Sequence, residues 1–222
     1  MATTPRLDRD QVVHTALELL NEVGLEGLTL RRIAKELNVQ APALYWHFRN
    51  KQALLDEMAT TIYRRLLDQE GTPGPEADWK EWLVRVHQAL RRSLLSYRDG
   101  ARVFSGSRFT DLSHAAVMED QLGRMTRAGF TPATAARAAF VVYAFTEGFV
   151  IEEQGVHPMP GERTPGYDTA QRAARLAGFP LAAATSEDLF DDYEARFEEG
   201  LRAVIAGVEW TYLGRSPHPH RS

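Results

Sequence analysis

Hydrogen-bonding and aromatic side chains gather near the N-terminus, in the stretch LTLRRIAKELNVQAPALYWHFRNK at residues 28–51. The amide of Gln40 can hydrogen-bond the edge of a base, and alanine methyl groups can touch thymine methyl groups. Hydroxyl, imidazole and ammonium groups can bond phosphate oxygens, and Arg31 can reach either a base or a phosphate. This chemistry predicts contact with duplex DNA. The candidate contact residues are Thr29, Arg31, Gln40, Ala41, Ala43, Tyr45, His47 and Lys51.

Two short helices joined by a tight turn are expected to hold these side chains. Thr29 is a natural N-cap for the first of them, and Asn38 stands where the turn needs a left-handed residue. Pro42 falls in the first turn of the second helix, where the missing N–H of proline costs nothing. The layout predicts a helix-turn-helix, whose second helix enters the major groove with its N-terminal residues at the base edges.

One further helix is expected before this motif, and another is expected after it. Asp8 or Asp10 can cap the first helix, and Gly24 can end it in a left-handed conformation. Asn50 can cap the later helix, expected over 51–68, whose N-terminus is itself an anion site. The pattern therefore predicts a three-helix unit that ends near residue 50.

The same stretch also fits a packing module that touches no DNA. In that interpretation the aromatic run from Tyr45 to Phe48 is core, and we expect Trp46 and Phe48 to be partly buried. Charge favours the DNA interpretation, because between Arg31 and Lys51 the basic side chains outnumber the carboxylates, while the whole chain carries a net charge of -4. A local basic face on an acidic protein suits specific contact with a duplex.

Composition bounds the class of protein. The chain of 222 residues has no cysteine, which excludes disulfides and thiolate chemistry and fits a reducing cytosol. Its first residues lack the apolar core of a secretory signal. The most apolar stretch, from Ala138 to Ile151, is too short to span a bilayer. We expect a cytoplasmic protein that does not interact with membranes.

Helical periodicity continues through the rest of the chain, and no stretch alternates as a strand would. The expected helices cover 79–96, 112–127, 132–154 and the region from 186 onward, with loops over 71–78 and 154–168. Ser186 is expected to cap the last helix, whose apolar side chains recur at steps of three and four. Those side chains are Phe190, Tyr193, Phe197, Leu201, Val204 and Val208.

The fold class predicted is all-α, with an N-terminal three-helix helix-turn-helix DNA-binding domain and a larger helical ligand-sensing and dimerisation domain. We place the first domain at residues 1–50, the second at 51–214 and a flexible tail at 215–222. The small-residue helix over 132–154 and the last apolar stripe each need a packing partner, which predicts a homodimer. The alternative is that both stripes belong to the core of a single chain.

Residues 21–55 resemble the DNA-binding domain of the TetR family of repressors. Three further segments resemble the sensor domain of the tetracycline-responsive members: LLSYRDGARV at 94–103, the segment 121–130, and GFVIEEQ at 148–154. The resemblance implies a homodimer joined by a four-helix bundle from the two long C-terminal helices of each subunit. It also implies that two helix-turn-helix units face a palindromic operator and that a small-molecule ligand changes their separation.

The resemblance also bears on the ligand. The tetracycline-responsive members hold their drug as a magnesium chelate, with two histidines and an asparagine at positions that match Leu67, Val86 and Phe104. Hydrocarbon side chains offer a hard cation no lone pair, so we expect neither a metal nor tetracycline here. Ala41 and Ala43 stand where those members have longer polar side chains, which predicts a different operator.

The remaining matched positions outline a pocket that is mainly apolar. Such a lining suits a hydrophobic organic molecule of drug or natural-product size, although each residue is equally compatible with ordinary core packing. The predicted ligand-binding residues are Leu67, Val86, Leu90, Phe104, Ser107, Gln121, Val142 and Glu152.

Two other classes of protein are alternatives to a ligand-responsive repressor. An enzyme is disfavoured because the chain shows no Ser/His/Asp ordering, metal-spaced His/Glu pair or phosphate-binding glycine loop. We therefore assign no catalytic residue and no cofactor. An architectural DNA-binding protein without an effector stays open, and it would show weak sequence preference with a strong response to salt.

Overall fold

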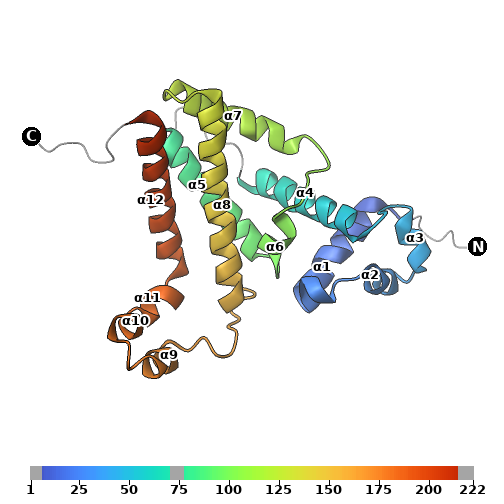
Figure 1. Cartoon of the computed structure of the whole chain (residues 1–222). Coiled ribbons are helices and arrows are strands. Elements are labelled where there is room, and N and C mark those ends of the chain that lie inside the picture. The colour runs from blue at the N-terminus through green and yellow to red at the C-terminus, as the bar shows by residue number, and fades with distance from the viewer. Residues whose placement is uncertain (1–6, 71–77, 215–222) are drawn as a thin grey trace, which may run out of the picture. The chain divides into compact units, whose positions relative to one another are not determined.

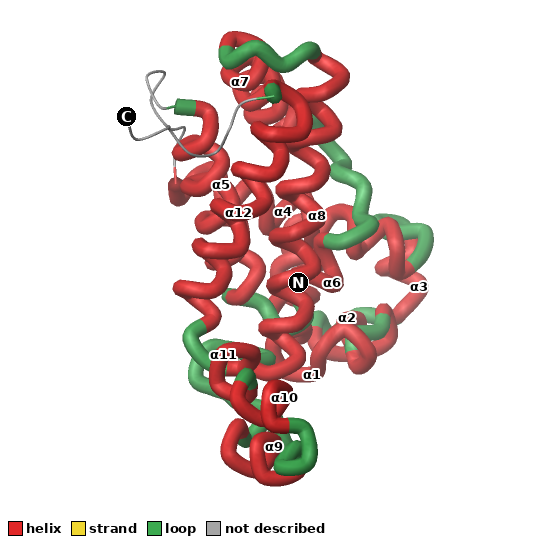
Figure 2. The backbone as a smooth tube through the Cα atoms, turned by 60° about the vertical axis from the view of Figure 1, so that its left-hand side comes forward, coloured by secondary structure: helices red, strands yellow, loops and turns green. Residues whose placement is uncertain are grey.

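The structure, a computed structural model, describes residues 7–70 and 78–214, and every regular element in these ranges is a helix (Figures 1 and 2). The all-α prediction is confirmed. Most of the predicted 71–78 loop and the whole 215–222 tail lie outside the described residues. The helices are α1 (Arg9–Gly27), α2 (Leu30–Glu36), α3 (Ala41–Tyr45), α4 (Lys51–Glu70), α5 (Trp79–Leu95), α6 (Gly100–Phe104), α7 (Ser113–Arg127), α8 (Pro132–Val156), α9 (Thr169–Arg175), α10 (Pro180–Ala184), α11 (Ser186–Phe190) and α12 (Tyr193–Leu213).

The chain divides into two compact units. The N-terminal unit comprises residues 1–72 and 92–117, and the C-terminal unit comprises residues 73–91 and 118–222. Helices α5 and α7 each contribute residues to both units. The two units are described separately below.

The N-cap signals in the N-terminal unit act as predicted, but the glycine expected to end the first helix does not. The Asp8 carboxylate accepts a hydrogen bond from the Gln11 amide at 2.7 Å and so caps α1. Gly24 is left-handed, with φ 67°, but the helix kinks there and continues to Gly27 instead of ending. The Asn50 side chain accepts from the Ala53 amide at 2.8 Å at the start of α4.

The turn between α2 and α3 also follows the sequence. The Thr29 hydroxyl accepts from the Arg32 amide at 3.2 Å, and Asn38 is left-handed with φ 52°. Ile33, Leu44 and Phe48 are fully buried beneath the motif. Because α3 has only five residues, its own hydrogen bonds cannot keep it folded, and these apolar contacts stabilise it.

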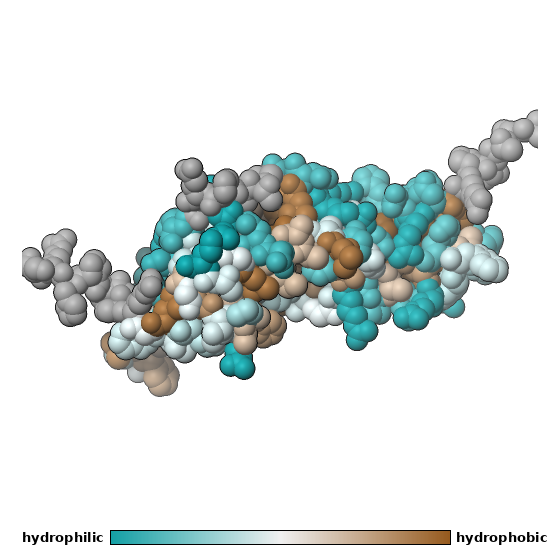
Figure 3. All heavy atoms as spheres, turned by 90° about the horizontal axis from the view of Figure 1, so that it is seen from above, coloured by the Kyte–Doolittle hydropathy of each residue, from teal (hydrophilic) through white to brown (hydrophobic). Residues whose placement is uncertain are grey.

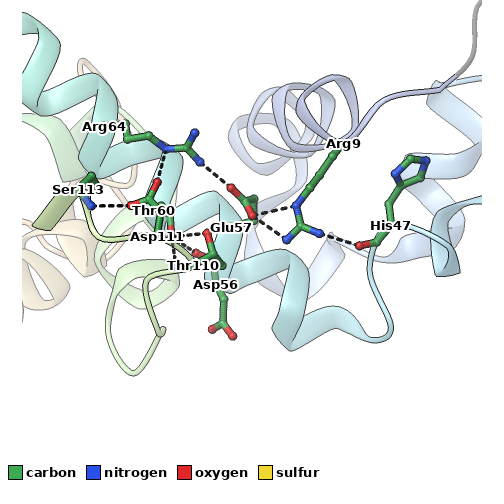
Figure 4. Close-up of polar contacts among 9 residues, drawn as sticks. All are labelled: Arg9, His47, Asp56, Glu57, Thr60, Arg64, Thr110, Asp111 and Ser113. Carbon is green, nitrogen blue, oxygen red and sulfur yellow. Dashed lines mark hydrogen bonds and ion pairs between the residues drawn. The ribbon is translucent and has the colours of Figure 1, made fainter.

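A buried carboxylate joins separate segments of the N-terminal unit. Glu57 on α4 accepts from Arg9 of α1 at 2.7 Å and from Arg64 at 2.6 Å (Figure 4). Arg64 also pairs with Asp111, which precedes α7, at 3.3 Å. Two guanidinium groups compensate the cost of removing the Glu57 carboxylate from water. The network therefore ties α1 and the 105–112 segment to α4.

A short helix, α6, lies in the 97–111 interval, where the sequence predicted no helix. Asp99 takes a left-handed conformation with φ 55°, and α6 begins directly after it. The chain then passes so close to the end of α5 that a Cβ on Gly100 would lie 2.1 Å from the Leu94 carbonyl oxygen. The predicted end of the preceding helix at residue 96 agrees with the end of α5 at Leu95, but the helical turn of α6 was not predicted.

Helices α8 and α12 form the core of the C-terminal unit and lie side by side in Figures 1 and 2. Phe149 packs edge-on against Phe197 with ring centroids 5.2 Å apart. Gly200 lets the helices approach closely, since a Cβ there would lie 2.7 Å from the Phe145 ring. Gly200 thus serves the close packing of α8 and α12 within one chain.

The expected start of the last helix was wrong. Ser186 begins the short α11, and α12 starts at Tyr193. The break occurs because Asp192 is left-handed, with φ 46°, and its carboxylate caps the new helix by accepting from the Ala195 amide at 3.3 Å. Phe190 therefore lies on a different helix from the rest of the predicted stripe. The short helices α9 and α10 were not predicted.

One helix among the described residues, α8, is long and apolar enough to cross a membrane by length and composition, with a mean hydropathy of 1.3. It is longer than the apolar stretch singled out in the sequence. It packs on α12, and its buried residues include Glu147 and Glu153.

Gly100→Ala tests the close approach at the start of α6. The added Cβ would meet backbone, which cannot move aside cheaply, so we expect a loss of at least about 2 kcal/mol of stability. Thermal unfolding followed by circular dichroism measures the change. Gly155→Ala on α8, where a Cβ meets nothing within 4 Å, is the matched control. Equal melting temperatures for the two variants would contradict the contact.

Candidate functional site

The first turn of α3 is an open polar surface. Gln40 is the N-cap residue, yet its side chain makes no capping bond. Pro42 occupies the first turn as predicted, so no N–H is lost there. The Gln40 amide is exposed and available to a partner outside the chain.

The predicted DNA-contact residues differ in exposure, but none is buried. The exposed ones are Thr29, Arg31, Gln40 and Tyr45, and the half-buried ones are Ala41, Ala43, His47 and Lys51. Tyr45 is 57% exposed, which leaves its phenol free to meet a phosphate. These side chains lie on or beside α2, α3 and the start of α4, and their contacts with DNA stay a prediction.

Two of these residues also hold the unit together. The Lys51 ammonium donates to the Leu25 carbonyl oxygen at 2.8 Å, which joins α4 to the end of α1. The His47 carbonyl oxygen accepts from Arg9 at 2.9 Å (Figure 4). Because an ammonium has three N–H donors, Lys51 can bond both Leu25 and a phosphate.

Trp46 is the functional candidate that the sequence analysis missed. It was expected to be partly buried, but 90% of it is exposed. The cause is the end of α3 at Tyr45, after which the His47 and Phe48 amides both bond the Leu44 carbonyl. Phe48 turns inward and is fully buried, whereas Trp46 turns outward. An exposed indole beside Tyr45 offers one more N–H donor to DNA.

Three predicted ligand-binding residues lie in the N-terminal unit. Leu67 is half-buried on α4, and Phe104 is buried at the end of α6. Phe104 meets the ring of Phe109 edge-on, with centroids 5.4 Å apart. The Ser107 hydroxyl donates to the Val103 carbonyl at 2.6 Å, so its proton is already engaged.

The other five predicted ligand-binding residues lie in the C-terminal unit. Leu90 and Val142 are buried, Val86 and Gln121 are half-buried, and Glu152 is exposed. Across the described residues, no group of three or more histidine and carboxylate side chains is placed to hold a metal ion. The roles of all these residues in binding a ligand stay predictions.

A cavity of about 680 Å³ lies on the C-terminal unit, between the second half of α8 and helices α11 and α12. Five of its thirteen lining residues are aromatic, and the Arg196 guanidinium lies 4.9 Å from the centroid of the Tyr193 ring. Glu152 is the predicted ligand-binding residue that borders it. The sequence did not predict this cavity. Its lining includes residues from both α11 and α12, and the break between these helices was not predicted.

A buried histidine joins α5 to α8. The Thr146 hydroxyl donates to the Val142 carbonyl at 3.1 Å and lies 2.9 Å from His87 Nδ1. His87 Nδ1 therefore carries a proton and donates it to Thr146. Burial lowers the pKa of His87 to about 4, so the imidazole is neutral at pH 7.

The comparison with known families decides the identity. The sequence model described as "Bacterial regulatory proteins, tetR family" matches residues 12–58. The model described as "Tetracyclin repressor-like, C-terminal domain" matches residues 72–212. The chain belongs to the TetR family. Its helix-turn-helix falls within the first match and its C-terminal unit almost wholly within the second.

Curated relatives support the assignment along nearly the whole chain. The chain is 41% identical to the tetracycline repressor protein class C of Escherichia coli over 207 residues, which are 92% of this chain and 91% of the relative. It is 38% identical to the class A repressor from transposon 1721 of Escherichia coli over 205 residues, covering 91% of each.

Solved structures of other TetR-family proteins agree. A possible TetR family regulator from Streptomyces coelicolor A3(2) matches with a TM-score of 0.79 and 40% identity, covering 92% of this chain and 100% of the other. ActR of Streptomyces coelicolor in complex with actinorhodin matches with a TM-score of 0.75 and 28% identity, covering 91% of this chain and 96% of the other.

Leu44→Ala and Trp46→Ala compare how a buried and an exposed side chain of the helix-turn-helix contribute to stability. Leu44 is fully buried, so its truncation should cost about 2–5 kcal/mol of stability. Trp46 is largely exposed, so its truncation should change stability by less than about 0.5 kcal/mol. Chemical denaturation measures both. A large loss for Trp46→Ala would show that its side chain packs against the protein.

Proposed function

We propose that this TetR-family chain is a ligand-responsive transcriptional repressor that binds a palindromic operator as a homodimer. We further propose that a mainly apolar small molecule releases it. The observation that carries the proposal is the surface of α3, where Gln40, Tyr45 and Trp46 are exposed above a buried apolar base. We assign DNA contact to residues 1–50 and ligand binding and dimerisation to residues 51–214.

The proposed DNA contacts follow from the position of each group. Gln40 stands at the N-terminus of α3, the end that meets base edges in this motif, and its amide can pair with an adenine. Tyr45 and Trp46 stand at the other end of α3, where an O–H and an N–H can bond phosphates. Gln40 would then determine sequence preference, and the aromatic pair would supply general affinity.

Exposed apolar side chains on the C-terminal unit support a homodimer. On α8, Phe140 is 67% exposed and is followed along the same face by Ala144 and Gly148; on α12, Trp210 is 58% exposed. Apolar side chains also reach the surface among polar ones on the face seen in Figure 3. A second copy that covers α8 and α12 would form a four-helix bundle and remove these apolar groups from water.

The proposed ligand is apolar and binds without a metal. Solved relatives include a TetR variant of Acinetobacter baumannii with minocycline and ActR with actinorhodin. In this chain, hydrocarbon side chains stand at Leu67, Val86 and Phe104, and none of them can ligate magnesium. The ligand would act by preferring the conformation whose two helix-turn-helix units misfit the operator.

Selection from random duplex DNA tests the DNA side of the proposal. We expect the wild-type chain to enrich a single palindrome. Gln40→Ala should change the preferred bases, because its amide reads a base edge. Tyr45→Phe should weaken binding to every sequence alike, because only a phosphate bond is lost. An unaltered preference for Gln40→Ala would refute its role, and no enrichment at all would favour an architectural protein.

Asp68→Asn is the matched control for these variants. It changes an exposed charge near the far end of α4, about 25 Å along the helix from Lys51. We expect its affinity and sequence preference to equal those of the wild-type chain.

Release of the selected operator tests the ligand side. Tetracycline with magnesium should leave the protein–DNA complex intact, because the chain lacks donors at Leu67, Val86 and Phe104. A panel of apolar natural products should contain a compound that releases it, and a chelator such as EDTA should not alter that release. Fluorescence anisotropy of labelled operator measures both. Magnesium-dependent release by tetracycline would overturn the apolar assignment.

A further inference from the structure

Glu147 on α8 is a buried carboxyl group without a partner. It is 5% exposed, and neither of its side-chain oxygens accepts or donates a hydrogen bond within the described residues. Other buried charges of this unit are paired, as where Arg91 donates to both oxygens of Glu153 at 2.8 and 2.7 Å. An unsatisfied buried carboxyl is costly, so Glu147 needs a partner that the described residues do not provide.

The hydrogen bonds between α5 and α8 show on which side of the contact between these two helices Glu147 lies. His87 meets Thr146, and Arg91 meets Glu153 further along both helices, so α5 and α8 run roughly parallel. In two facing parallel helices, the residue before His87 and the residue after Thr146 fall on the same side of the contact. Val86 and Glu147 therefore share one side.

The same periodicity places Leu90 and Tyr143 beside them. Helix α12 occupies the opposite side, where Phe145 and Phe149 of α8 pack against Phe197. Val86 and Leu90 are two of the residues predicted to line the ligand pocket. Glu147 thus lies with the predicted pocket residues and away from α12.

Burial keeps the Glu147 side chain protonated when no cation is bound next to it. Burial raises the pKa of Glu147 to about 8, so the protonated form predominates at pH 7. Burial raises the pKa of the Tyr143 phenol, one helical turn earlier, and the nearby Glu147 raises it further. Val86 and Tyr143 are only half-buried, so accessible surface remains on this side of the contact. A ligand that brings a basic nitrogen would convert the carboxyl to a paired carboxylate.

We propose that Glu147 is the polar anchor of the ligand site and receives the basic nitrogen of an otherwise apolar inducer. This inference rests on the proposed release by a small molecule and narrows its class to hydrophobic amines. The aromatic ring of Tyr143 adds a second group that attracts a cation. Val86 and Leu90 supply the apolar surface for the rest of the molecule.

A matched pair of fluorescent probes tests the assignment directly. 1-Pyrenemethylamine carries an ammonium group at pH 7, and 1-pyrenemethanol has a neutral hydroxyl on the same ring system. Fluorescence titration of the full chain should show the amine bound about tenfold more tightly or better, the size of a charged hydrogen bond. In Glu147→Gln the two affinities should become equal, with the affinity for the alcohol unchanged.

Two further variants serve as an alternative to Glu147→Gln and as a control. Glu147→Leu fills the space with hydrocarbon and should retain the fold while losing the preference for the amine, so it serves if Glu147→Gln unfolds. Glu119→Gln neutralises an exposed carboxylate on α7 and should keep the preference. Equal affinities in the wild-type chain, binding of neither probe, or a preference that survives Glu147→Gln would overturn the assignment. Because operator selection is measured separately, this assignment can fail while the repressor function stands.

Discussion

The contact between α5 and α8 is the interaction on which the C-terminal unit depends. His87 bonds Thr146 in a fully buried setting, and one turn further along α5 the Arg91 guanidinium pairs with Glu153 and with Glu194 of α12. Removing one partner of a buried ion pair costs several kcal/mol, because the other charge is left unpaired. The contact therefore orients both faces of α8, one toward α12 and one toward Val86 and Leu90.

A similar constraint acts in the N-terminal unit. Helix α3 is too short to persist by its own hydrogen bonds, and the buried Leu44 and Phe48 hold it to the helices behind it. The Glu57 carboxylate, shared by Arg9 and Arg64, joins α1 to α4. In the proposed repressor, these contacts let the exposed side of α3 meet DNA in a defined geometry, which specific reading of bases requires.

Some of the proposed functional residues could be predicted from the sequence, and others could not. Gln40 and Tyr45 follow from the motif, because the residues of a helix-turn-helix that meet DNA occupy known positions relative to its turn. Glu147 has no such signal, because its neighbours along the chain do not reveal that it is buried without a partner. The exposure of Trp46 was mispredicted, because an aromatic residue two positions from the buried Phe48 was expected to share its core environment.

The features that the sequence alone predicted correctly depend on interactions between residues close together in the chain. The caps at Asp8, Thr29 and Asn50 and the left-handed turn at Asn38 are interactions among residues a few positions apart, and all of them occur as predicted. The all-α fold followed from helical periodicity. Tertiary contacts decided the rest: the single turn of α6 beside α5, the separation of α11 from α12, and the burial of Glu147. These features depend on which distant helices meet, and no short stretch of sequence encodes that encounter.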